Sequence, residues 1–145
     1  MAQTMSHTKA LTQYQWLAFV VGVIYLTVGV AGFFITGAEG VAERGASQKL
    51  FGLAINQLHD VVHLSTGFLG VIMWSGASRA RAFGWSIVAV YSTIFLSGLT
   101  AVKGPEGGPV NIDVAGSWLH ILTVVAGLLI ALWPDGDRSH PDRPA

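Results

Sequence analysis

The chain has 145 residues, of which 52% are hydrophobic and only 11% are charged, and its formal net charge is zero. About a quarter of the residues of a soluble domain are charged, so this balance, with a mean hydropathy of +0.55, indicates an integral membrane protein. The neutral charge gives no sign of nucleic acid as a partner. The absence of cysteine excludes disulfides, iron–sulfur clusters and thiolate metal ligands.

Four apolar segments are each close to the length of about 20 residues that crosses a bilayer as a helix. They are residues 14–36, 57–75, 83–102 and 115–133. Because lipid offers backbone groups no other partner, we predict an all-α integral membrane four-helix bundle over residues 14–133. The alternative for the second segment is a buried amphipathic helix. Residues 76–82 are expected to form a tight loop between the second and third helices.

The tails and the basic residues predict how the bundle is oriented. Residues 1–13 read as a solvated N-terminal tail, and residues 134–145, rich in proline and charge, as a disordered C-terminal tail. These tails and the second loop carry five basic residues, against three in the other two loops. The positive-inside rule therefore places both termini in the cytoplasm.

The second and fourth segments share a polar pattern. His63-x-x-Thr66-x-x-x-Gly70 matches His120-x-x-Thr123-x-x-x-Gly127, and seven residues before each histidine stands a residue that can cap a helix, Asn56 or Asp113. The first and third segments match in the same way, with Tyr25-x-Thr27 and Gly32 against Tyr91-x-Thr93 and Gly98. We therefore predict a duplicated helical hairpin, a parallel repeat that sets His63 and His120 at equal depth.

Three histidines are the candidate site. His59 and His63 are four residues apart and share one helical face, while His120 comes from the fourth helix. Three neutral imidazoles are the ligand set of some catalytic zinc sites, and they also suit copper or iron. Alternatively, His63 and His120 alone are axial ligands of a haem or a chlorin. Asn56, Asp60 and Asp113 are the expected hydrogen-bond partners that orient the rings.

Two further interpretations stay open. The histidines could instead be hydrogen-bonding glue inside a structural accessory subunit of a larger membrane complex, associated with other subunits or with itself. His59-Asp60-Val61-Val62-His63 also approximates the zinc-peptidase motif H-E-x-x-H, with a shorter acid in place of the catalytic glutamate. No phosphate-binding loop, nucleophile motif or acid–base pair stands elsewhere in the sequence, which favours a protein that is not an enzyme.

The histidine motifs resemble those of a known family. Asn56, Leu58-His59, Val62-His63-Leu64 with Gly67, and Trp118-Leu119-His120 are similar to the signature of the small bacterial four-helix membrane proteins known as domain of unknown function 4383. The resemblance implies the four-helix topology and a multi-pass protein of the bacterial inner membrane. It marks His59, His63 and His120 as the positions to test. Asp60 departs from the asparagine expected there, and the resemblance implies no activity.

Overall fold

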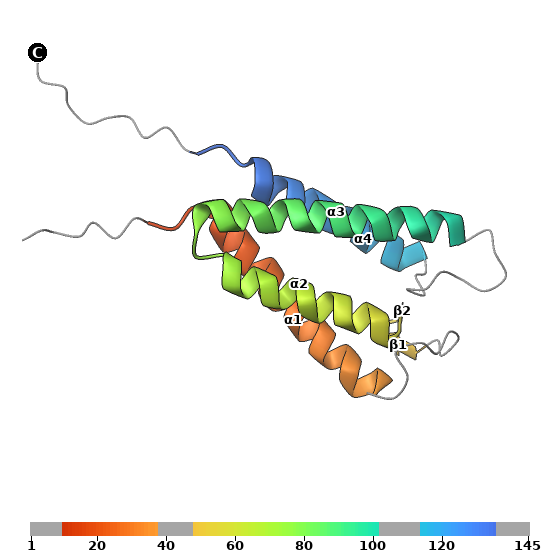
Figure 1. Cartoon of the computed structure of the whole chain (residues 1–145). Helices are drawn as coiled ribbons and strands as arrows, with labels where there is room; N and C mark the ends of the chain where they lie inside the picture. The colour runs from red at the N-terminus through yellow and green to blue at the C-terminus, as the bar shows by residue number, and fades with distance from the viewer. Residues whose placement is uncertain (1–9, 38–47, 102–113, 136–145) are drawn as a thin grey trace, which may run out of the picture.

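The computed structural model of this chain describes residues 10–37, 48–101 and 114–135. Its helices are α1 (Gln13–Thr36), α2 (Gln57–Met73), α3 (Ala77–Ala101) and α4 (Val114–Leu132), with two short strands, β1 (Gln48–Leu50) and β2 (Leu53–Ile55), between α1 and α2 (Figure 1). The predicted all-α bundle is confirmed. The predictions for most of both tails and for Asp113 lie outside the described residues.

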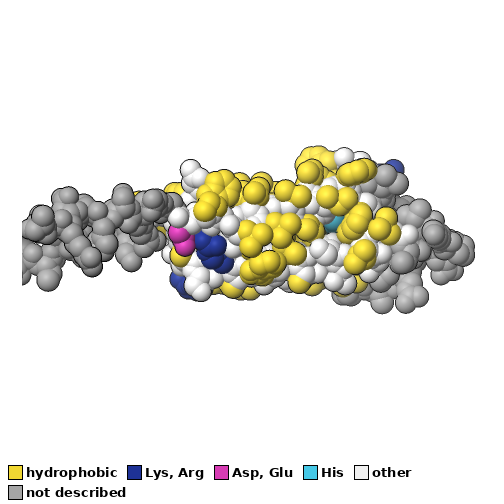
Figure 2. All heavy atoms as spheres, turned by 90° about the horizontal axis from the view of Figure 1, so that it is seen from above, with side chains coloured by type: hydrophobic (Ala, Val, Ile, Leu, Met, Phe, Trp, Pro, Cys, Tyr) yellow, Lys and Arg dark blue, Asp and Glu magenta, His cyan; other side chains and the backbone are white. Residues whose placement is uncertain are grey.

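The outside of the bundle is apolar. Three stretches, Gln13–Thr36, Ala77–Leu99 and Ala115–Leu132, are long and apolar enough to cross a membrane. Large apolar side chains such as Phe34, Trp118 and Leu122 are exposed, and Figure 2 shows hydrophobic side chains spread along one face. α2 has 17 residues, which makes about 25 Å of helix, slightly less than the hydrocarbon thickness. These helices are those of a membrane protein, since lipid rather than water suits such a surface.

The helices pack as two antiparallel hairpins, α1 with α2 and α3 with α4. Glycines let the paired backbones approach closely. A Cβ at Gly67 would lie 2.2 Å from the backbone nitrogen of Leu26, and one at Gly84 would lie 2.7 Å from the carbonyl oxygen of Gly127. Because no side chain larger than hydrogen fits there, these contacts set the distance between the two helices of each hairpin.

One end of the bundle is closed by Arg81 of α3. Its guanidinium donates hydrogen bonds to the carbonyl oxygens of Ala131 (2.8 Å) and Trp133 (2.7 Å), and it lies 4.6 Å from the ring centroid of Tyr14. α1 begins and α4 ends at this end (Figure 1). Arg81 therefore satisfies carbonyls that the end of α4 leaves free, and its contact with Tyr14 of α1 links the two hairpins.

The second loop is shorter than predicted. α3 begins at Ala77 rather than at residue 83, so only residues 74–76 connect α2 to α3. The intervening residues are mostly alanine and arginine, which favour helix although they lower the hydropathy. The predicted boundary was wrong because hydropathy marks where the apolar segment starts, whereas the helix continues beyond it.

The first loop contains a β-hairpin that was not predicted. β1 and β2 pair antiparallel through Gln48 with Ile55 and Leu50 with Leu53. The turn is Phe51-Gly52, with φ of 52° and 84°, which is typical of the two-residue turn with two left-handed positions. Between the two strands, Gly52 is the only turn signal, and strands this short show no alternating pattern.

Candidate functional site

The start of α2 is anchored in a way that fixes the first histidine. The side-chain oxygen of Asn56 accepts a hydrogen bond from the backbone nitrogen of His59 at 2.9 Å, so Asn56 caps α2 as the sequence predicts. The side-chain amide of Gln57 donates to the carbonyl oxygen of Gly37 at 2.6 Å. The first turn of α2 is thereby held against the end of α1.

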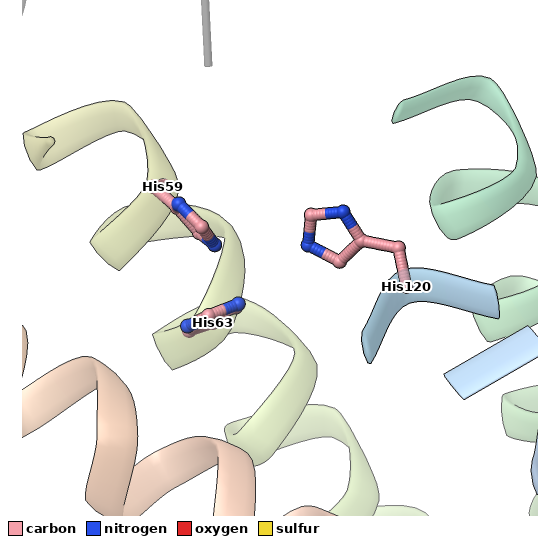
Figure 3. A group of neighbouring side chains, drawn as sticks. All are labelled: His59, His63 and His120. Carbon is pink, nitrogen blue, oxygen red and sulfur yellow. The ribbon is translucent and has the colours of Figure 1, made fainter. Parts of the chain in front are cut away.

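The structure brings His59, His63 and His120 together. One ligand nitrogen from each lies within 4.8 Å of the others. The ring centroids of His59 and His63 are 4.3 Å apart, and those of His59 and His120 are 5.6 Å apart. Figure 3 shows two rings from α2 and one from α4 pointing toward one another. All three side chains are buried. We call these three residues the histidine triad.

Two tyrosines that the sequence pattern did not predict at the site lie against the triad. The ring of Tyr25 meets His63 edge-on at 4.9 Å, and the ring centroid of Tyr91 lies 5.4 Å from that of His120. Tyr25 of α1 is hydrogen-bonded to Thr123 of α4, and the Tyr91 hydroxyl of α3 donates to Thr66 of α2 at 3.3 Å. Each tyrosine therefore links its own hairpin to the histidine-bearing helix of the other.

Asp60 faces α1. Its Oδ2 accepts a hydrogen bond from the Thr36 hydroxyl at 2.8 Å, and a Cβ added at Gly32 would lie 1.9 Å from Oδ1. Oδ1 has no hydrogen-bond partner among the described residues. The carboxylate thus packs between α1 and α2, so its described geometry lends no support to a peptidase in which it would act as the base.

A cavity of about 310 Å³ adjoins the triad. Its walls come from α1, α4 and the β-hairpin, including Val28, Leu50, Ile55 and Leu122. The hairpin therefore covers part of the site. Its contribution could not be predicted, since nothing in the sequence indicates which face of the first loop turns toward the histidines.

The triad has unused hydrogen-bonding capacity. The Nδ1 atoms of His63 and His120 are buried and have no hydrogen-bond partner in the described part of the chain. A buried polar atom without a partner costs about 1–3 kcal/mol, so such atoms usually mark a ligand or a function. Neutral imidazole nitrogens at this spacing are donors that fit zinc, copper or iron.

Fold and site together define a membrane protein built from two helical hairpins that enclose a buried histidine triad. The model of the family described as a domain of unknown function (DUF4383) matches residues 15–133, and the chain belongs to this family. No curated protein and no solved structure matches it. The resemblance of the two histidine motifs to this family is confirmed.

Proposed function

We propose that the histidine triad binds one transition-metal ion, with His59, His63 and His120 as its protein ligands. The observation that carries the proposal is the convergence of three buried imidazoles from two helices, with ligand nitrogens within 4.8 Å of one another. Zinc and copper are the expected ions because neutral imidazole is a preferred ligand of both.

The spacing is close to what a metal requires. With metal–nitrogen bonds of about 2.0–2.1 Å, nitrogens in a tetrahedral site lie about 3.3 Å apart. The ligand nitrogens, at up to 4.8 Å, therefore have to converge by roughly 1.5 Å. Small rotations of the three side chains can supply this movement. His120 belongs to a different helix from the other two, so its ring can turn toward theirs independently.

A tetrapyrrole fits the described geometry less well than a metal ion. The macrocycle would have to lie between its two axial ligands, His63 and His120. The ring of His59 already lies 4.3 Å from His63 and 5.6 Å from His120, measured between centroids. A third imidazole so near both rings favours a single ion that all three can reach.

A structural accessory subunit, with the histidines as hydrogen-bonding glue, is the rival function. Glue requires the ring nitrogens to be paired, yet Nδ1 of His63 and of His120 has no partner among the described residues. That observation supports metal binding over glue.

We further infer a multi-pass protein of the bacterial inner membrane with both termini in the cytoplasm, so that the triad lies toward the outer face. Lipid is its first partner, and association with itself or with other membrane subunits is not required for the site.

Metal analysis of the purified protein tests the proposal. We expect roughly one zinc or copper ion per chain in protein prepared in detergent without chelators. In His63→Ala and His120→Ala the content should fall by at least about tenfold, because two imidazoles alone bind weakly. Elemental analysis of the intact protein, with Co²⁺ absorption spectra as a second readout, measures both.

His140→Ala is the matched control, since it removes an imidazole that lies outside the triad. It should keep the metal content of the wild type. A metal-free wild-type protein that also fails to bind added Co²⁺ would contradict the proposal. A Soret absorption band in the wild type that His63→Ala abolishes would instead support the tetrapyrrole.

A further inference from the structure

We infer that the cavity beside the histidine triad takes a small, mostly apolar molecule that presents one donor atom, oxygen, nitrogen or sulfur, to the triad. The inference rests on the proposed function in one respect: a bound metal ion with three histidine ligands keeps a further position for that donor atom. The shape and chemistry of the cavity carry the rest.

The size of the cavity suits a modest ligand. Its volume of about 310 Å³ lies at the lower end of the range of about 300–1,000 Å³ found for small-molecule sites. Such a space accommodates a single ring or a short chain. It exceeds by far what one water molecule needs.

The walls select an apolar molecule. Most of the lining side chains are hydrocarbon, among them Val21, Val28, Leu53 and Ile55. Water gains little in such a space because it finds few hydrogen-bond partners, and apolar cavities of this kind stay dry and bind apolar guests. The body of the ligand therefore has to be apolar.

Among the described residues that line the cavity, the triad is the part of the wall best placed to receive a polar atom. Besides the triad, the polar side chains of the lining are Tyr25 and Thr123, and these two are hydrogen-bonded to each other. Nδ1 of His63 and Nδ1 of His120 have no such partner within the described ranges. A polar group of the ligand is thus directed to the triad, as an orienting contact in an otherwise apolar site.

The rim of the cavity indicates entry from the bilayer. Ile24, Leu119 and Leu122 line the cavity and are also substantially exposed. Figure 2 shows a histidine surface visible between hydrophobic side chains on one face of the bundle. An apolar molecule dissolved in lipid meets this rim directly, whereas a water-soluble molecule has to cross an apolar surface to reach the triad.

Two thiols with the same donor atom test the inference. Hexanethiol carries an apolar chain and 2-mercaptoethanol a polar one. On Co²⁺-loaded protein, we expect the sulfur-to-cobalt charge-transfer band to appear at a concentration about tenfold lower with hexanethiol, because its chain is buried in the cavity. On chelator-treated protein, hexanethiol but not 2-mercaptoethanol should raise the unfolding temperature.

Cavity-filling variants separate binding in the cavity from partitioning into lipid. Val28→Trp and Leu122→Trp fill the cavity from α1 and from α4, while Val30→Trp places the same side chain on an exposed position of α1 that does not line the cavity. The filled variants should lose both hexanethiol effects, and Val30→Trp should keep them. Two filling variants from different helices guard against one that fails to fold.

The outcomes distinguish this inference from the proposed function. Normal Co²⁺ binding with equal responses to the two thiols, or with hexanethiol effects that survive in both filled variants, overturns the inference and leaves the metal site standing. No Co²⁺ binding, but a stabilisation by hexanethiol that both filled variants lose, refutes the metal site and supports an apolar ligand site.

Discussion

At the scale of single residues, Gly67 and Gly32 decide how α2 meets α1. The backbone of α1 occupies the space where a side chain of residue 67 would stand, and the carboxylate of Asp60 occupies the space beside Gly32. Gly67 is one turn of α2 beyond His63, so the contact that sets the distance between the helices also sets the depth of the triad. Packing at these glycines and the geometry of the site are therefore linked.

Gly67→Ala should destabilise the protein. The added methyl would lie 2.2 Å from the backbone nitrogen of Leu26, so α1 and α2 must separate, at a cost of about 1–3 kcal/mol in the free energy of unfolding. Thermal unfolding in detergent measures the effect, and metal content should fall with it. Leu69→Ala, an exposed position on the same helix, is the control. Equal stability of the two variants would show that the close contact does not hold the hairpin.

At the scale of elements, the β-hairpin is the part of the first loop that shapes the site. Leu50 and Ile55 are buried and line the cavity, while Phe51 at the tip is 89% exposed. Phe51 has a φ of 52°, a conformation that a bulky residue rarely adopts and that asparagine or glycine adopts readily. Phe51 is thus a residue with an unfavourable backbone conformation at the tip of the β-hairpin, which covers the triad.

Gly52→Val should open the cover over the triad. Residue 52 has a φ of 84°, which a β-branched side chain cannot adopt without strain, so the turn and the strand pairing are lost. We expect the triad histidines to react several-fold faster with diethylpyrocarbonate, as measured by peptide mass spectrometry. Phe51→Asn keeps the turn chemistry and should react at the wild-type rate. Unchanged reactivity in Gly52→Val would mean that the hairpin does not shield the triad.

At the scale of the whole molecule, the two hairpins contact each other reciprocally. Tyr25 is hydrogen-bonded to Thr123, and Tyr91 to Thr66; these are the pairs that a two-fold relation between the hairpins requires. The register that matches His63 to His120 matches His59 to Gly116, which lines the cavity. The duplication stays a prediction, which these contacts support. On this interpretation the two repeats differ at this position: one carries His59, the third ligand, and the other carries Gly116, which borders the cavity.

The orientation in the membrane can be tested because the chain has no cysteine. Ala10 precedes α1 at one end of the bundle, and Phe51 lies on the hairpin at the opposite end (Figure 1). A membrane-impermeant maleimide should label Phe51→Cys on intact spheroplasts and Ala10→Cys only after lysis. The reverse pattern would place the termini outside. Labelling of both variants from the same side would contradict a spanning bundle with these two positions on opposite faces.

The composition and the spacing of residues are enough to predict the helical fold, the shared face of two histidines and the cap of α2. Runs of about 20 apolar residues leave helices as the only structure that satisfies the backbone in lipid. The spacing of His59 and His63 puts both rings on one helical face, and Asn56 before them provides the helix cap that the structure contains. These conclusions need only local geometry, which is why they could be drawn without coordinates.

Other features depend on contacts between distant segments, and only the tertiary structure decides them. Asp60 is next to His59 in the sequence, yet its carboxylate packs against Gly32 and Thr36 of α1 because neighbours on a helix point about 100° apart. The two tyrosines and the β-hairpin join the site through packing across the hairpins, and periodicity within one segment carries no information about that. Four helices and three histidines of interest follow from the sequence, whereas the packing of the α1–α2 hairpin against the α3–α4 hairpin brings the three rings together beside an apolar cavity.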